Sequence, residues 1–131
     1  MSKYGLVAVV AARHIAETRI EPVAAWKAAA AELISESREL RDKACPRGAF
    51  LGLCEEGLVK GVAPGHYHRG YRMNKVYALR GVDILRYEPE LAGNVGKLWS
   101  RVVGNHAVGH HGQVDVVVEL WINGLIRTRS Q

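Results

Sequence analysis

The chain has 131 residues, of which 48% are hydrophobic and 24% are charged, the proportions of an ordinary soluble globular domain. This length suffices for one domain with its own hydrophobic core, so we expect a single domain over residues 1–131. The apolar run at residues 5–12 is much shorter than the roughly 18 residues of a membrane span, and charged positions follow it. We therefore expect neither a membrane-spanning segment nor a membrane partner.

The two cysteines, Cys45 and Cys54, lie nine residues apart on one predicted helix. A disulfide needs Cα atoms within about 7 Å, and nine residues of helix span about twice that distance. We therefore expect reduced thiols and a cytoplasmic protein. Cys54 belongs to an apolar helical face, and Cys45 lies near a helix start, so packing and structural roles are favoured over a nucleophile.

The net charge of +5 is concentrated in one segment of the chain. Residues 60–86 hold six Lys or Arg against the single acid Asp83, whereas residues 1–59 and 87–131 each balance. A local excess of positive charge attracts phosphate, nucleic acid or an acidic protein surface. The alternative is a solvated surface whose counter-charges come from elsewhere in the fold.

Residues 3–19 and 22–34 carry apolar side chains at helical spacing and are predicted to form the first two helices. Pro22 suits the first turn of the second helix, where a missing N–H costs nothing. The charged stretch 35–43 loses this spacing. It is predicted to be either a frayed extension of the second helix or a surface loop.

The stretch 45–62 is predicted to form a helix with a defined start and end. Pro46 suits its first position, and Gly57 suits the left-handed residue that follows a helix. Leu53 and Leu58 then occupy the positions that pack together in a Schellman ending. The start signal, the apolar face and the end signal of this predicted helix are consistent with one another.

The next elements alternate between irregular and helical. Residues 61–72 contain three glycines and a proline and are predicted to form a long loop. Residues 73–87 and 89–103 are each predicted to be one helix. A connector rich in His and Gly, residues 105–112, follows them.

The last element, residues 113–127, fits two patterns, because its valines fall at both helical and strand spacing. No other segment offers a partner strand, so a helix is favoured. Its ending, Leu-Trp-Ile-Asn-Gly-Leu-Ile-Arg, matches Leu-Cys-Glu-Glu-Gly-Leu-Val-Lys when Gly124 is aligned with Gly57. This match indicates either a weak internal duplication or, as we favour, a common way for helices to end.

These elements predict an all-α fold, a compact single-domain bundle of about five or six helices with two long Gly/His-rich loops. Trp26, Trp99 and Trp121 all lie on apolar helical stripes and are expected to be core residues.

Two motifs resemble those of a family of small bacterial proteins of unknown function. They are Cys-Pro-x-x-Ala-Phe-Leu-Gly-Leu-Cys-Glu-x-Gly-Leu-Val-Lys-Gly at residues 45–61 and His-Gly-Gln-x-Asp-Val-Val-x-x-Leu-Trp-x-x-Gly-Leu-Ile at residues 111–126. Asn74, Tyr77 and Ala78 continue the resemblance, which covers roughly residues 22–127. It implies a compact, helical bacterial protein and carries no activity.

The first loop and the helix start after it combine positive charge, flat side chains and flexible backbone. Arg and Lys neutralise phosphates while Tyr and His stack on bases, which is how proteins grip single strands and nucleotides. The candidate anion-binding residues are His66, Tyr67, His68, Arg69, Tyr71, Arg72, Asn74 and Lys75.

The second loop offers possible further contributors, His110, His111 and Asp115. The pattern His-Gly-Gln-x-Asp is either a polar cluster in a pocket or, as we favour, a helix start. In the second case Asp115 stabilises the first turn and Gln113 caps it.

The histidines are the most plausible catalytic or metal-binding material. If both loops lie at one end of the bundle, imidazoles and Asp115 could converge on a zinc ion. No spacing matches a recognised metal or nucleophile motif, so we predict no metal and no cofactor. The question of an enzyme stays open, with a binding module favoured.

The leading hypothesis is a module that binds an anionic partner, either a nucleic acid or a nucleotide, through residues 60–86; an acidic protein surface is the second candidate. The alternatives are a small His-dependent hydrolase or metal-dependent enzyme, and a helical protein–protein adaptor. The hydrolase or metal-dependent enzyme would use His66, His68, His110 or His111. The sequence indicates no oligomeric state.

Overall fold

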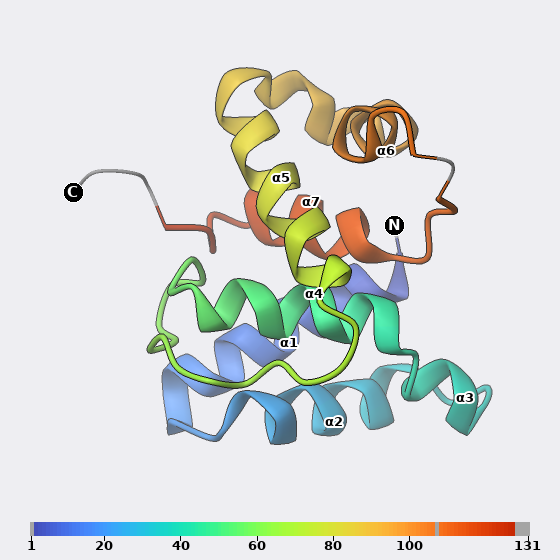
Figure 1. Ribbon diagram of the computed structural model, residues 1–131. Helices are drawn as coiled ribbons and strands as arrows, with labels where there is room; N and C mark the ends of the chain where they lie inside the picture. Colours follow the sequence, from blue (N-terminus) through green and yellow to red (C-terminus); the bar gives the residue numbers. More distant parts are fainter. Residues whose placement is uncertain (1, 107, 128–131) are drawn as a thin grey trace.

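The computed structural model describes residues 2–106 and 108–127. Position 107 of the expected 105–112 connector and the two ends of the expected 1–131 domain lie outside the described residues. Within those ranges the chain forms seven α-helices and one 3-10 helix: α1 Lys3–Thr18, α2 Pro22–Leu33, α3 Arg38–Arg41, α4 Ala44–Glu55, α5 Met73–Tyr87, η1 Pro89–Gly93, α6 Val95–Val103 and α7 Gln113–Ile122 (Figure 1). The prediction of an all-α bundle is confirmed.

Helix α7 is the most enclosed element, and its burial explains why its sequence fits both a helix and a strand. It packs against α1, α4, α5, α6 and η1, with α5 crossing it in the view of Figure 1. Seven of its ten residues are buried, including Val116, Val117 and Val118 in succession. A helix covered on nearly all sides has no polar face, so its apolar spacing resembles that of a strand.

Helices α4 and α5 touch backbone to backbone at a glycine. A Cβ at Gly52 would lie 2.6 Å from the Cβ of Lys75 and 2.9 Å from its Cα. Real Cβ atoms do not approach one another so closely, so only glycine lets the two helices cross here. The crossing places Lys75 directly over the C-terminal half of α4.

Helices α4 and α7 both end in the Schellman motif that the sequence predicts for α4. The N–H of Leu58 donates to Leu53 O at 3.1 Å, and the N–H of Leu125 donates to Leu120 O at 2.8 Å. The left-handed residue is a glycine in both helices, with φ of 74° after α4 and 70° after α7. Only glycine adopts this conformation without strain.

The two helix endings then pair with each other. Val59 and Ile126 form an isolated antiparallel bridge. Lys60 N–H donates to Leu125 O, and Arg127 N–H donates to Leu58 O, both at 2.8 Å. Residues that match in the sequence alignment therefore make equivalent bonds, as across a local twofold axis. The sequence similarity around Gly57 and Gly124 therefore reflects a symmetric pairing of the two helix endings.

Two predicted helix boundaries are wrong. Residues 89–103 are two elements because Asn94, with φ −143°, starts a new helix by accepting the N–H of Lys97 on its side chain. Helix α4 begins at Ala44, two residues before Pro46. Pro46 still falls in the first turn, where N–H groups have no partner within the helix.

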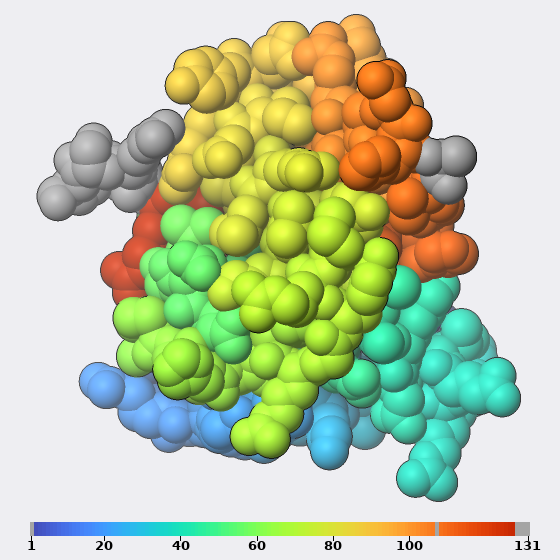
Figure 2. Space-filling view, viewed as in Figure 1, coloured from blue at the N-terminus to red at the C-terminus, as the bar shows by residue number. Residues whose placement is uncertain are grey.

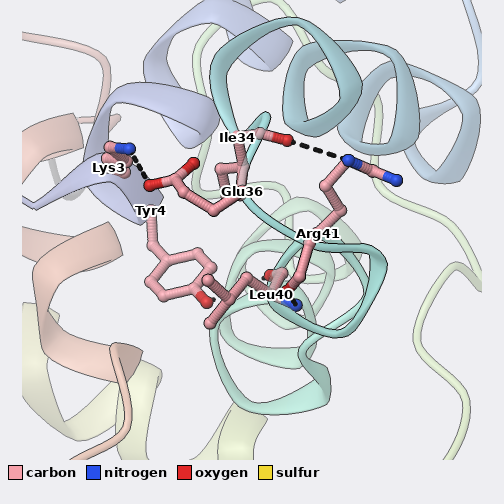
Figure 3. Close-up of polar contacts among 7 residues, drawn as sticks. Lys3, Tyr4, Ile34, Glu36, Leu40 and Arg41 are labelled. Carbon is pink, nitrogen blue, oxygen red and sulfur yellow. Dashed lines mark hydrogen bonds and ion pairs between the residues drawn. The ribbon is translucent and has the colours of Figure 1, made fainter.

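The charged stretch 35–43 takes neither of its two expected forms, because it contains the short separate helix α3. Ser37 starts α3 by accepting the N–H of Leu40 on its hydroxyl. Figure 3 shows the contacts that tie the stretch to α1 and to the end of α2: Lys3 with Glu36, Tyr4 Oη–H donating to Leu40 O, and Arg41 donating to Ile34 O.

Two of the three tryptophans are core residues. Trp26 and Trp99 are 1% and 7% exposed, which confirms the prediction for them. Trp121, near the end of α7, is only half-buried but packs against the core, so the prediction is confirmed for it only in part. No helix in the described part of the chain is long and apolar enough to cross a membrane.

The two thiols are expected to differ in reactivity. Both cysteines are free; Cys45 is half-buried, whereas Cys54 is completely buried, and burial raises the pKa of the Cys54 thiol. Iodoacetamide at neutral pH should therefore modify Cys45 in the native protein and Cys54 only after unfolding. Peptide mass spectrometry measures both rates. Equal modification of the two thiols in the native protein would contradict the buried placement of Cys54.

Candidate functional site

The loop at residues 62–72 runs along the front of the molecule, from the end of α4 back to the start of α5 (Figure 1). Its side chains form the middle of the face seen in Figure 2. The loop consists of bends, turns and irregular backbone, as its glycines and proline predict. Such a loop needs an anchor to hold its polar backbone in place.

Glu55, at the last position of α4, is that anchor. Its Oε2 accepts the backbone N–H groups of Tyr67 and His68, both at 2.8 Å, and its Oε1 accepts from Lys75 Nζ at 2.7 Å. Lys75 Nζ also pairs with Glu56 at 2.8 Å. The side chains of Glu55 and Lys75 are only 14% and 18% exposed, so solvent screens the pair weakly.

The charge state of Glu55 follows from these bonds. Desolvation alone would raise the pKa of its carboxyl, but the hydrogen bonds from Lys75, His68 and Tyr67 and the charge of Lys75 outweigh it. The result is a pKa of about 2. The carboxyl of Glu55 is therefore ionised at neutral and at mildly acidic pH.

Five of the predicted site residues line one hollow of about 480 Å³, here called the loop hollow; its lining is Glu55, His66, His68, Arg69, Gly70, Arg72 and Lys75. Because Lys75 is paired with Glu55 and Glu56, it adds no net attraction for an anion. Arg69 and Arg72 make no ion pair with any described residue. The two arginines therefore supply the charge of the loop hollow.

His68 lies at the inner side of the loop hollow. Its Nε2 lies 2.9 Å from where a Cβ of Gly48 would be, so the ring rests against α4. Burial lowers the pKa of His68, the charges of Lys75, Arg72 and Arg47 lower it further, and Glu55 opposes them. His68 is therefore neutral at neutral pH and offers a flat ring and a hydrogen-bonding nitrogen.

The other three residues predicted in the first loop lie apart from the hollow. Tyr67 turns towards the end of α1, where its Oη–H donates to Ala63 O at 2.8 Å. Asn74 is 3% exposed, and its Oδ1 accepts from Gln113 Nε2 at 3.3 Å, which joins α5 to α7. Tyr71 is 65% exposed. Of the three, only Tyr71 offers a free aromatic surface.

The second-loop residues His110, His111 and Asp115 do not line the loop hollow. The His110 ring packs on Trp99 with centroids 5.0 Å apart, and its Nε2 accepts the N–H of Val114 at 3.3 Å. The expected cap by Gln113 is wrong: its Oε1 accepts the N–H of His111, and His110 serves the start of α7 instead. Asp115 lies in the first turn of α7, as expected.

Among the described residues, no group of three or more His, Cys, Asp or Glu side chains is placed to hold a metal ion. The two loops lead into helices α5 and α7, whose first turns are joined by the bond between Asn74 and Gln113. Their imidazoles nevertheless have separate partners, since His68 rests on α4 and His110 on Trp99. His68 and His110 therefore do not converge on one metal ion in the described part of the chain, and the hydrolase hypothesis stays a prediction.

Residues 1–127 match the model of a family of unknown function, DUF6979. The chain belongs to this family. The match includes α1, which the resemblance to known motifs covers less clearly. Comparisons with the curated proteins and with the solved structures found no match.

This DUF6979 chain carries a second basic hollow that the sequence analysis missed. It measures about 620 Å³ and is called the arginine hollow; its lining is Lys27, Ala30, Ala31, Arg38, Arg41, Asp42 and Arg47. Four cations face one acid, and the ion pair between Arg38 and Asp42 is loose at 3.6 Å. Charges balance over residues 1–59 as a whole, so a sum along the sequence hides this cluster.

The arginine hollow and the loop hollow adjoin on this DUF6979 chain. Arg47 lines the arginine hollow, and the next residue, Gly48, contacts His68 of the loop hollow. The charge of Arg47 also contributes to the lowering of the pKa of His68. We call the two hollows together the basic face.

Proposed function

We propose that this protein binds single-stranded nucleic acid along the basic face. The observation that carries the proposal is the junction of the two basic hollows at Arg47, Gly48 and His68. An extended polyanion can occupy both hollows at once, whereas a single nucleotide fills only one. A polymer therefore uses more of the positive charge than a small anion does.

The charge of the basic face supports a phosphate backbone as the ligand. Lys75 and Glu55 neutralise each other, and Asp42 offsets one arginine. The remaining cations come from α2, α3, α4 and the loop, and they are Lys27, Arg41, Arg47, Arg69 and Arg72. Arginine suits this task because its planar guanidinium can bind two phosphate oxygens at once.

Flat side chains beside the arginines favour a single strand over a duplex. Tyr71 is largely exposed, and His66 and His68 line the loop hollow. Unpaired bases can stack on such rings, whereas the bases of a duplex are already stacked on one another. The free thiols and the resemblance to a bacterial family support a bacterial cytoplasmic setting, where such ligands are abundant.

Removal of Arg69 and Arg72 tests the proposal. Fluorescence anisotropy with a labelled single-stranded oligonucleotide at low salt should show about tenfold weaker binding by the variant carrying Arg69→Ala and Arg72→Ala. Each lost phosphate contact reduces the steepness of log K against log salt by about 0.7, so the slope should become shallower by about 1.4.

The matched control removes the same charge elsewhere. Arg13 on α1 and Lys97 on α6 line neither hollow, and Arg13→Ala with Lys97→Ala gives the same net charge as the test variant. This control should keep the wild-type slope. Equal losses in both double variants would show that only total charge matters, and no binding by the wild type at low salt would refute the proposal.

A further inference from the structure

We infer that a second, separate site binds a phosphate monoester that carries a planar ring. The site is a pocket of about 500 Å³, here called the aromatic pocket; its lining is Lys60, Arg86, Tyr87, Trp121, Gly124, Ile126 and Arg127. It shares no lining residue with either hollow of the basic face. Its volume falls in the range of small-molecule sites.

The pairing of the two helix endings places two cations at this pocket. Val59 and Ile126 face the core, at 0% and 7% exposed. Side chains alternate along paired segments, so Lys60 and Arg127, which follow them, both project to the outer side. The backbone bonds of 2.8 Å on either side of the bridge hold both positions in register.

A third cation comes from the last turn of α5. Arg86 is 19% exposed in its side chain, its Nη2 donates to Arg127 O at 3.2 Å, and its Nη1 lies 3.6 Å from Asp83. The bond to Arg127 fixes the guanidinium against the paired ending, while Asp83, which does not line the pocket, offsets part of its charge from 3.6 Å. No acidic side chain lines the pocket among the residues that the structure describes.

Two aromatic side chains give the pocket its second property. Tyr87 is 80% exposed, and Trp121 is half-buried near the end of α7, where Ile122 is also exposed. Both line the same pocket, together with Ile126. An aromatic surface beside three cations suits a ligand with a flat ring and a compact double negative charge.

A phosphate monoester has that chemistry, because its phosphate carries nearly two negative charges at neutral pH. Three cations can neutralise it while the ring of the ligand packs on Trp121 or Tyr87. The ring can be the base of a nucleoside monophosphate or a smaller aryl group. Both sources share the same recognition and differ in how much of the pocket they fill.

Titrations followed by ¹H–¹⁵N NMR test the inference. The probes are adenosine 5′-monophosphate, phenyl phosphate, adenosine and inorganic phosphate. We expect the first to shift the Trp121 indole N–H and the Gly124 amide with a Kd of about 1 mM or tighter, and to bind at least about tenfold tighter than either adenosine or inorganic phosphate. Phenyl phosphate that binds as tightly as the nucleotide would assign the ring subsite to a small aryl group and still support the inference.

Variants separate this pocket from the basic face. Lys60→Ala and Arg127→Ala should each weaken nucleotide binding about fivefold or more, and Trp121→Phe should keep most of it. Arg69→Ala with Arg72→Ala should leave it unchanged. The inference fails if inorganic phosphate binds as tightly as the nucleotide, if the Arg69 and Arg72 variant abolishes binding, or if no probe shifts Trp121.

Discussion

Gly52→Val is expected to destabilise the protein by about 3 kcal/mol, because overpacking at a tight crossing forces backbone to move. The added Cβ would lie 2.6 Å from the Cβ of Lys75 and 2.9 Å from its Cα. A side-chain rotation cannot relieve a contact with Cα, so α4 and α5 must separate. Urea unfolding measures the loss.

The same substitution should loosen the loop. Displacing Lys75 moves its ammonium away from Glu55, which holds the backbone N–H groups of Tyr67 and His68. Hydrogen exchange at these two amides should therefore rise by more than global stability alone explains.

Gly96→Val is the matched control for this crossing. Gly96 is also a helical glycine, on the exposed side of α6, and a Cβ there would meet only Asn94 Oδ1, at 3.9 Å. The free energy of unfolding should change by less than about 0.5 kcal/mol. Equal effects of the two substitutions would show that the α4–α5 contact at Gly52 is not close.

Glu55→Gln is expected to cost about 2–3 kcal/mol, the cost of removing a charged acceptor from weakly solvated hydrogen bonds. An amide cannot accept from Lys75 and from the Tyr67 and His68 N–H groups as the carboxylate does. Glu56→Gln is the matched control, since Glu56 pairs with the same Lys75 but has a side chain that is 48% exposed. That change should cost no more than about 1 kcal/mol.

The pH dependence of stability gives a second test of Glu55. Its pKa falls from 4.5 to about 2 on folding, so its contribution is complete above pH 4.5 and is lost as the pH falls towards 2. Folding also lowers the pKa values of His68 and His110. Below about pH 6.5 the unfolded chain therefore binds more protons at these histidines than the folded chain does, and stability starts to fall before Glu55 is protonated. Glu55→Gln should therefore show a shallower loss of stability below pH 4.5 than the wild type. If the variant lost stability below pH 4.5 as steeply as the wild type, Glu55 would not be the anchor of the loop.

Local features of the sequence predicted the helix endings well. Gly57 and Gly124 each adopt the left-handed conformation that ends a helix, and the leucine after each supplies the packing that closes a Schellman motif. Those signals lie within a few residues of one another, so no knowledge of the tertiary fold is needed. The break at Asn94 was missed because apolar spacing continues across it.

Features that depend on tertiary placement were not predictable in the same way. Arg47 and His68 are far apart in the sequence, and only the packing of the loop on α4 at Gly48 brings the two hollows together. Trp121 fits an apolar stripe, but it is only half-buried near the end of α7. Spacing along one helix indicates which side chains share a face and not what covers that face.

An NMR footprint of a single-stranded oligonucleotide tests the basic face most directly. On titration of a strand of about ten nucleotides at low salt, we predict that amides of residues 38–48 and 66–72 shift together along one binding curve, because one strand spans both hollows. Shifts confined to one hollow, shifts centred on Trp121, or no shifts at all would contradict the account.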